Sequence, residues 1–362
     1  MAVDGKRKQT RSRRSSPSRA KLDDVARAAN VSTATASRVL NAPDTVSEHT
    51  RNKVRVAIKQ LGWIPHGAAQ ALATLRTRTV GALIPTLGHQ TIAAMLESLQ
   101  STLGDAGYTL ILGRPYQHAD RTVAQVSKMI QQGVECMILM GEDHPPEVFA
   151  RLDERDIFTV IAYTSGRDGR PNCIGFDNFL EMSKLTQHLL DLGHRDFAVI
   201  TRPHEGNDRI RQRIEGVNHT LAQLGVAVRP QHLVFVPDWT IGSGRMGMRA
   251  LLGTEPHPTA VICANDYLAS GAIIEAKRAG YSVPDDFSIV GFDNVDLAEH
   301  IDPPLTTIYV PAKVIGEQVG RFVVENLEGR EAQLPPRIDA ELIVRGSTAA
   351  PRQRPIELVG EC

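Results

Sequence analysis

Residues 22–41, LDDVARAANVSTATASRVLN, contain two short helical patterns separated by a tight turn. In the first pattern, four apolar residues share one stripe at i, i+3, i+4 and i+7, namely Leu22, Val25, Ala26 and Ala29. In the second, Ser32 is a natural N-cap, and three apolar residues face inward, namely Ala36, Val39 and Leu40. The stretch therefore predicts two short helices packed on a small shared core.

The outer face of the second helix carries small or polar groups and one guanidinium. The residues on or near this face are Thr33, Ala34, Thr35, Ser37, Arg38 and Asn41. Small side chains let a helix lie close to base edges and phosphates, and an arginine can donate two hydrogen bonds to guanine. The face predicts binding in the DNA major groove, although periodicity alone also fits any helical hairpin with a polar outer side.

A third helical pattern follows with Ser47 as its cap. Val54, Ile58 and Leu61 lie at i, i+4 and i+7, and Gly62 closes the pattern. The sequence therefore predicts a three-helix unit whose helices share one core.

Charge is distributed unevenly along a chain whose net charge is zero. Residues 1–80 hold 16 Lys and Arg against 5 Asp and Glu, a surplus of 11, so the remainder carries −11. Neutralising phosphates releases condensed counterions, so a basic head on an acidic body indicates a polyanionic partner for the head. Residues 1–20, rich in Arg, Lys and Ser, are expected to be a disordered basic tail.

Length and composition favour two or three domains in a chain of 362 residues. No apolar run is long enough to span a bilayer and the N-terminus has no hydrophobic segment, so we expect a cytoplasmic protein without a membrane partner. The four cysteines lie far apart without a CxxC pair or histidines at metal spacing, which indicates neither a disulfide framework nor a metal site.

From Thr79 onward, short β-type runs alternate with helical patterns, as in parallel sheets with crossover helices. The runs are residues 80–84, 109–112, 137–140, 159–162, 197–200, 233–236, 260–263 and 288–290. Eight units exceed one small sheet, so we divide them into two lobes near Asp177. Ligands of open α/β sheets bind beyond the carboxyl ends of the strands, which places a site between the lobes.

The chain resembles the LacI-type (lactose/galactose-repressor) family of bacterial transcription regulators through a dense series of motifs. After LDDVARAANVSTATASRVLN come VSEHTRNKV, LGWIPHGAAQALA, GALIP, GHRDFAVI, RIEGV, HPTAVICANDYLASGA, VPDDFSIVGFDN and DPPLTTI. The resemblance implies an α-helical helix-turn-helix domain with a hinge helix, followed by a two-lobed α/β effector domain like a periplasmic binding protein. It also implies a homodimer that binds operator DNA and a small-molecule effector, without a cofactor.

The resemblance sets the expected domain boundaries. They are a helix-turn-helix domain at 21–64, a hinge at 65–78, an effector and dimerisation domain at 79–346, and a C-terminal tail at 347–362. The first lobe spans about 79–177 and 308–337, and the second about 178–307 and 338–346. Leu72 matches the hinge leucine that the family wedges between central base pairs of the operator. Lys21 replaces a capping threonine, which costs about 1 kcal/mol unless another cap compensates.

Carried over by motif, several residues match positions that line the family's effector cleft. They are Arg213 in RQRIEGV, Asn265 and Asp266 in CANDY, Asp293 in GFDN and Trp239 in PDWT, with Gln90 and Thr91 as further candidates. Tyr163 stands where lactose-type repressors have an aspartate, and losing that carboxylate favours an anionic ligand. Residues 174–179, IGFDNF, resemble the gluconate-repressor branch, so a sugar or a sugar acid such as gluconate is the expected effector.

Two other functions fit parts of the sequence. Residues 242–247, GSGRMG, match GxGxxG, as in a dinucleotide-binding oxidoreductase, but Pro237 to Ile241 separate the preceding strand from the first glycine. A solute-binding protein would share the two-lobed body, but would not carry a basic DNA-binding head. We find no other catalytic motif and therefore expect a repressor rather than an enzyme.

Overall fold

The computed structural model describes residues 20–64, 71, 76–115 and 118–352, which fall into two compact units, Met1–Thr77 and Arg78–Cys362. The expected tail at 1–20, apart from Ala20, and most of the expected hinge lie outside the described residues. No helix among the described residues is long and apolar enough to cross a membrane.

The first unit is a three-helix domain. Its elements are α1 (Leu22–Ala28), α2 (Thr33–Asn41), the short 3-10 helix η1 (Pro43–Thr45) and α3 (Glu48–Leu61). The shared core consists of Val25, Ala29, Val39, Val54 and Ala57. The prediction that Leu61 faces this core is wrong, since it is 40% exposed. Ala57 takes the inward place because it lies three residues after Val54, and Leu61 ends the helix.

Capping defines the helix ends of this unit. Ser32 Oγ accepts a hydrogen bond from Thr35 N–H, and Ser47 Oγ accepts one from Thr50 N–H, as the sequence predicts. Lys21 provides no side-chain acceptor, but its backbone N–H donates to Asp24 Oδ2 over 2.9 Å. This is the reciprocal half of a capping box, so part of the expected cost at Lys21 is offset.

The second unit contains two parallel sheets. In the first lobe, the strand order is β2-β1-β3-β4-β5, with β1 at Thr79–Leu83, β2 at Thr109–Gly113, β3 at Cys136–Met140, β4 at Phe158–Ala162 and β5 at Cys173–Ile174. Its helices are α5 (Gln90–Asp105), α6 (Ala119–Gln131), α7 (Pro146–Asp153) and α13 (Ala312–Leu327). The eight strands predicted from the sequence are all present, and β5 is an addition of two residues.

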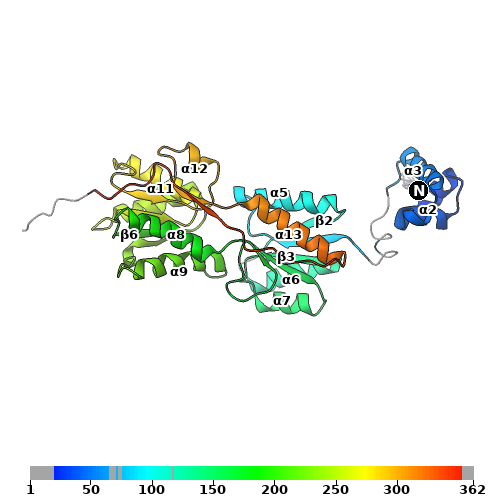
Figure 1. Ribbon diagram of the computed structural model, residues 1–362, viewed down its shortest axis with the longest axis horizontal. Helices are drawn as coiled ribbons and strands as arrows, with labels where there is room; N and C mark the ends of the chain where they lie inside the picture. Colours follow the sequence, from blue (N-terminus) through cyan, green and yellow to red (C-terminus); the bar gives the residue numbers. More distant parts are fainter. Residues whose placement is uncertain (1–19, 65–70, 72–75, 116–117, 353–362) are drawn as a thin grey trace, which may run out of the picture. The chain divides into compact units, whose positions relative to one another are not determined.

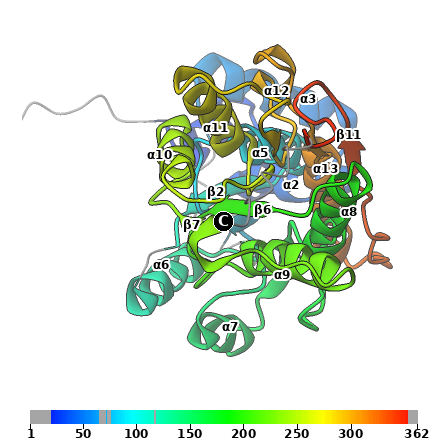
Figure 2. The same cartoon turned by 90° about the vertical axis from the view of Figure 1, so that its left-hand side faces the viewer.

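The sheet of the second lobe has the order β7-β6-β8-β9. The strands are β6 (Phe197–Thr201), β7 (Leu233–Phe235), β8 (Ala260–Cys263) and β9 (Ser288–Val290). The helices are α8 (Asn178–Asp191), α9 (Asp208–Ala222), α10 (Ile241–Leu252), α11 (Asp266–Arg278) and α12 (Leu297–His300), with the 3-10 helix η2 at Pro230–His232. Figure 2 shows the pair α8 and α9 on one side of this sheet and the pair α10 and α11 on the other. The central strands are buried on both faces, as expected for a parallel sheet.

The chain passes between the lobes more than once. Strand β10 (Thr307–Tyr309) pairs antiparallel with β11 (Glu341–Ile343), and α13, which lies between them in sequence, packs against α5 of the first lobe. Figure 1 shows α13 beside α5. The lobe boundary expected between residues 307 and 308 falls within β10, and the one expected between 337 and 338 lies just before β11.

Residues 347–349, which the sequence analysis assigns to the C-terminal tail, pack against the second lobe. Ser347 is fully buried, its Oγ donates to the Ile289 carbonyl, and its own carbonyl accepts from Ile289 N–H. The carbonyl of Ala349 lies 2.9 Å from His194 Nε2. The segment around Ser347 is therefore an integral part of the second lobe, because it supplies the hydrogen bonds that the edge of β9 and His194 require.

Candidate DNA-binding and effector sites

Helix α2 presents the residues predicted to contact DNA along its solvent-facing side. Four are exposed, namely Thr33, Ala34, Arg38 and Asn41, whereas Thr35 and Ser37 are half-buried. Leu72 lies outside the described residues.

Local hydrogen bonds hold this face in place. Thr33 Oγ1 donates to Asp23 Oδ1 over 2.9 Å and so ties α2 to α1, while the Thr35 hydroxyl lies 2.8 Å from Ser32 Oγ. Asn41 Nδ2 donates to Ser37 Oγ over 3.2 Å. The face combines fixed hydroxyls with the exposed guanidinium of Arg38, which is suitable for contacts with both phosphates and base edges.

Arg213 on α9 is the centre of the predicted effector cleft. Its side chain is almost fully buried, Nε donates to Asn178 Oδ1 and Nη1 donates to the Ala264 carbonyl, both over 2.9 Å. The guanidinium stacks on Phe292, 3.6 Å from the ring centroid. Its third nitrogen, Nη2, lies 4.0 Å from Asp293 Oδ1, beyond hydrogen-bond distance. Arg213 therefore keeps donor capacity for a ligand oxygen.

Asn265 and Asp293 approach Arg213 from the ends of neighbouring strands. Asn265 caps α11 by accepting the Leu268 N–H on Oδ1, so its amide nitrogen points the other way, toward His89 of the first lobe. Asp293 has a φ of 109° and the next residue, Asn294, one of 52°. Left-handed backbone at residues other than glycine costs free energy and is concentrated at functional sites. The strain thus agrees with a binding role for this loop.

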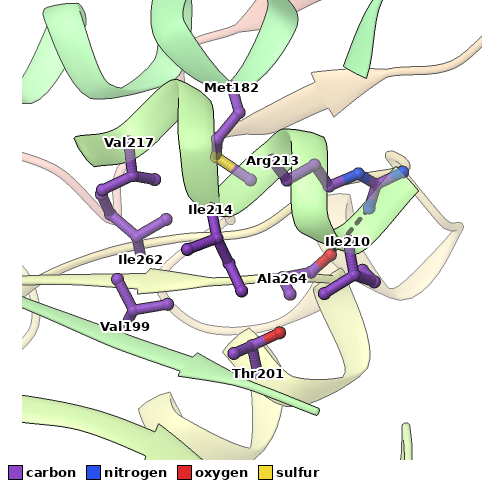
Figure 3. Close-up of a pocket in the computed structure, with 9 residues that line it drawn as sticks. All are labelled: Met182, Val199, Thr201, Ile210, Arg213, Ile214, Val217, Ile262 and Ala264. Carbon is purple, nitrogen blue, oxygen red and sulfur yellow. Dashed lines mark hydrogen bonds between the residues drawn. The ribbon is translucent and has the colours of Figure 1, made fainter. Parts of the chain in front are cut away.

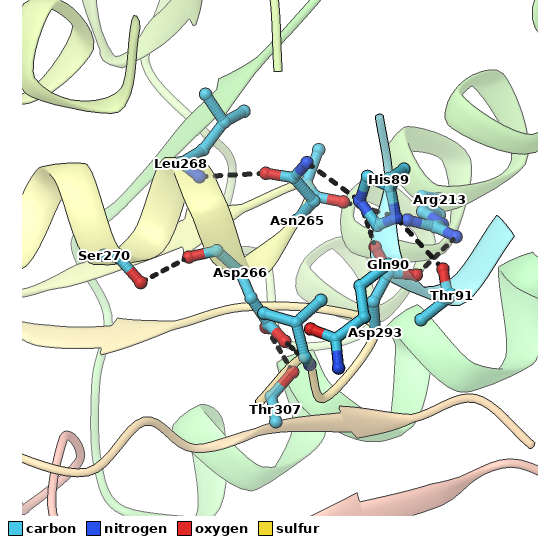
Figure 4. Close-up of polar contacts among 12 residues, drawn as sticks. His89, Gln90, Thr91, Arg213, Asn265, Asp266, Leu268, Ser270, Asp293 and Thr307 are labelled. Atoms are coloured by element: carbon cyan, nitrogen blue, oxygen red, sulfur yellow. Dashed lines mark hydrogen bonds and ion pairs between the residues drawn. The ribbon is translucent and has the colours of Figure 1, made fainter. Parts of the chain in front are cut away.

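His89, which the sequence interpretation missed, contacts Asp293 and Asn265 from the first lobe. Its Nε2 lies 3.2 Å from Asp293 Oδ2 and 3.4 Å from Asn265 Nδ2, and its ring packs edge-on against Tyr267. Figure 4 shows His89 among the side chains of the second lobe. The only sequence signal was its position in the loop after β1, immediately before Gln90.

Gln90 and Thr91, which the sequence does identify, support this contact. Gln90 Oε1 accepts the Asp296 N–H over 3.0 Å, a second hydrogen bond between the lobes, and Thr91 Oγ1 lies 3.0 Å from His89 Nδ1. Thr91 is therefore in position to orient the imidazole, and Gln90 reinforces closure.

Tyr163 and Trp239 occupy different parts of the second unit. Tyr163 is buried with a φ of 71°, and its carbonyl accepts from Asn178 Nδ2. Burial raises the pKa of its phenol and the charge of Asp293 raises it further, while the hydroxyl of Thr91 opposes the shift. Tyr163 thus belongs to the Arg213 cluster. Trp239 is half-buried against the core of the second lobe, with the Arg202 guanidinium 5.5 Å from its ring centroid.

Asp266, also predicted to bind the effector, has both carboxylate oxygens engaged inside the second lobe. Its side chain is fully buried, Oδ1 accepts from Thr307 Oγ1 over 2.5 Å, and Oδ2 accepts from Val295 N–H over 2.8 Å. Burial raises its pKa well above the ordinary value, and Asp293 adds to the shift. Both oxygens are occupied by backbone and hydroxyl donors, so Asp266 fixes the loop that carries Asp293.

Beneath Arg213 the second lobe contains a small apolar cavity, shown in Figure 3. It is lined mainly by aliphatic side chains of α8, α9, β6 and β8, and its volume of about 10 Å³ holds at most about one water molecule. This cavity is a packing defect below the cleft, too small for an effector.

The GxGxxG segment lies inside helix α10 and has a packing role. A Cβ at Gly244 would collide with the Leu268 carbonyl of α11, and one at Gly247 would meet Ile200 of β6. The segment follows the N-cap Thr240, and six residues, Val236 to Ile241, separate its first glycine from the end of β7. Its glycines permit close helix contact, so the nucleotide-binding interpretation has no structural basis here.

Comparisons with known proteins agree with this arrangement. Residues 21–66 match the model of bacterial regulatory proteins of the lacI family, and residues 186–348 match the periplasmic binding protein-like domain. The HTH-type transcriptional repressor CytR of Escherichia coli (strain K12) is 31% identical over 332 residues, which is 91% of this chain and 97% of that relative.

Two solved structures are also similar. The lac repressor dimer bound to operator and the anti-inducer ONPF has a TM-score of 0.80 and 26% identity, and the alignment covers 91% of this chain and 99% of the other. The complex of the transcriptional regulator CelR with cellobiose has a TM-score of 0.65 and 28% identity, over 91% of this chain and all of the other. This chain therefore belongs to the LacI family, as a DNA-binding transcriptional regulator with a periplasmic-binding-protein-like effector domain, and it is not an enzyme.

Proposed function

We propose that the protein is a homodimeric repressor whose operator affinity is controlled by a sugar or a sugar acid such as gluconate. One observation carries the effector half of this proposal. Arg213, Asn265 and Asp293 lie close together where the lobes meet: Arg213 and Asn265 each retain a donor, and Asp293 provides a carboxylate that His89 contacts from the first lobe. A buried guanidinium beside an amide and a carboxylate binds a group that combines acceptors with hydroxyl donors.

The DNA half rests on α2. Arg38 would donate to a base edge and Thr33, Ala34, Thr35, Ser37 and Asn41 would allow close approach to the groove. Leu72 would wedge between central base pairs, by resemblance to the family's hinge. Two equivalent half-sites of a palindrome require two heads, which is the physical reason for a dimer.

The effector class is supported by charge. Replacement of an aspartate by Tyr163 leaves a neutral phenol beside Arg213, which removes a repulsion against a ligand carboxylate. The relative in complex with cellobiose shows that the fold accepts a carbohydrate. Trp239 would offer an indole face to a sugar ring.

Closure of the lobes would couple effector binding to operator binding. An effector changes operator affinity only through its different affinities for two states of the body, typically about 1–3 kcal/mol of coupling. The contacts of His89 and Gln90 with the second lobe hold the two lobes together in this structure and would define one such state.

A mobility-shift assay on the palindromes near the protein's own gene tests the proposal. The full chain should shift at least one palindrome, and a sugar or sugar acid should change the midpoint by about 5-fold or more. Failure to shift any of them would contradict the DNA-binding half, whereas a shift unaffected by every sugar and sugar acid would contradict the effector half.

A further inference from the structure

A second polar cluster lies where the loop after β3 meets the first turn of α9. It consists of His144 from the first lobe and of Asp208 and Arg209 from the second. Both side chains of α9 approach Gly141, where an added Cβ would lie 3.0 Å from Arg209 Nε and would collide with Asp208 Oδ1. Gly141 also has a φ of 84°, so this position favours glycine for two reasons. The missing side chain at Gly141 thus leaves room for Asp208 and Arg209 beside the loop that carries His144.

Within the described part of the chain, each of these side chains has a buried atom without a hydrogen-bond partner. The atoms are Asp208 Oδ2, Arg209 Nε and His144 Nε2. Asp208 is only 1% exposed, and its other oxygen accepts from Asp143 N–H. Arg209 Nε lies 3.9 Å from Asp208 Oδ1, too far for a hydrogen bond. Buried polar atoms are normally paired, so an open acceptor and an open donor on adjacent residues are suited to binding a polar group of a ligand.

Charge restricts what this group is. A ligand carboxylate would be repelled by the carboxylate of Asp208, which is buried in the cluster. An ammonium would be repelled by Arg209. Burial lowers the pKa of His144 to about 4 and the charge of Arg209 contributes, so the imidazole is neutral at pH 7. The ligand group that fits the cluster is therefore a neutral one that both donates and accepts hydrogen bonds.

We propose that Asp208, Arg209 and His144 form a hydroxyl-binding subsite, in which a ligand hydroxyl donates to Asp208 Oδ2 and accepts from Arg209 Nε. The subsite rests on the proposed sugar-binding function and adds residues to it. Arg209 and Arg213 are four residues apart on α9 and so lie on one face of the helix. When a polyhydroxylated ligand is bound at Arg213, other hydroxyls of the same ligand therefore lie beside this cluster.

The test compares gluconate, glucose, ribose and cellobiose with hexanoate, which has the carboxylate and chain length of gluconate without its hydroxyls. Binding to the full chain is measured by calorimetry and by thermal shift. At least one hydroxylated probe should bind the wild type, and Asp208→Asn should weaken that probe at least about tenfold, because a hydrogen bond to a charged group is lost. The variant should leave hexanoate unchanged. Asp191→Asn, on the exposed end of α8, is the matched control and should bind like the wild type.

A ligand-free measurement separates binding from a structural role. Asparagine keeps the Oδ1 that accepts from Asp143 and loses only an oxygen without a partner, so the melting temperature of Asp208→Asn should match the wild type. A clearly lower melting temperature, equal binding of the hydroxylated probes by variant and wild type, or no binding of any hydroxylated probe by the wild type would each overturn the subsite. Operator binding of the wild type is measured in parallel. If the operator is bound, failure of the subsite leaves the proposed DNA-binding function intact.

Discussion

His89 Nε2 lies 3.2 Å from Asp293 Oδ2, so a side chain of the first lobe occupies the carboxylate that the second lobe offers to a ligand. A carboxylate only accepts hydrogen bonds, and Nε2 must therefore carry a proton. The amide of Asn265, whose orientation is fixed by its bond to Leu268 N–H, then directs its nitrogen at a ring nitrogen that cannot accept. That amide donor remains available to an effector, whereas Asp293 has to be released by His89 first.

Replacing His89 should therefore open the body in the absence of ligand. His89→Ala removes the pair with Asp293, which is worth about 1 kcal/mol or more, and should increase the radius of gyration measured by small-angle scattering. His118→Ala, an exposed histidine of the same lobe, is the control and should leave the scattering curve unchanged. Identical curves for all three proteins would show that His89 does not hold the lobes together.

Arg38→Ala should weaken specific operator binding by about 1–3 kcal/mol and relax preference at one base pair. The guanidinium of Arg38 is exposed on α2, where a bidentate bond to guanine is sterically open. Arg27→Ala on α1 removes an exposed charge paired with Asp24 and should lower affinity without changing sequence preference. Competition assays with single-base operator variants distinguish the two effects, and unchanged discrimination in Arg38→Ala would remove this residue from base recognition.

Arg213→Lys should lose effector response more readily than operator binding. Lysine keeps the positive charge beside Asp293 but not the planar donors that now reach Asn178 and Ala264, so the fold should lose about 1–3 kcal/mol. The effector-dependent mobility shift should require at least about tenfold more ligand. A normal response in this variant would place the ligand away from Arg213.

Gly244→Ala should destabilise the second lobe by about 1–3 kcal/mol, because the new methyl group forces α10 away from the Leu268 carbonyl of α11. Gly242→Ala in the same motif meets nothing closer than 3.6 Å and should be nearly neutral. Urea denaturation of the two variants measures the difference. If the glycines instead contacted a nucleotide, both variants would unfold like the wild type and differ in cofactor binding.

Local rules account for the features that the sequence predicts well. Ser32 and Ser47 cap helices because each side chain bonds within three residues, and the strands repeat a buried apolar pattern. The missed features depend on distant segments. His89 is important only because the loop of Asp293, about 200 residues later, is folded against it, and β5 has just two residues of pattern.

For Asp266, the sequence context suggests a ligand contact, but the packing of the side chain does not. As a carboxylate directly after Asn265 at the carboxyl end of a strand, it has the sequence context of a ligand residue. Its side chain turns inward because Val295 N–H and the Thr307 hydroxyl, both remote in sequence, need an acceptor. The sequence motif identifies the segment around Asn265 and Asp266 as part of the site. Which of its side chains can contact a ligand is decided by three-dimensional packing.

Protonation of His194 should make the second lobe sensitive to acid. The ring is 1% exposed, with Nδ1 2.9 Å from Thr259 Oγ1 and Nε2 2.9 Å from the Ala349 carbonyl. Burial lowers its pKa below the ordinary value of about 6.5, so the unfolded chain binds more protons than the folded one. The stabilisation is complete above about pH 6.5 and is lost as the pH falls toward the folded-state pKa.

His194→Gln, which keeps a donor and an acceptor without a titrating group, should therefore reduce the loss of stability between pH 7.5 and pH 5.5. Urea midpoints at the two pH values measure this difference, with His300→Gln on exposed α12 as the control that retains the wild-type slope. Part of the slope should persist in the variant, because burial also lowers the pKa of His144, His188 and His232. An unchanged slope would show that protonation of His194 does not contribute to the pH dependence of stability.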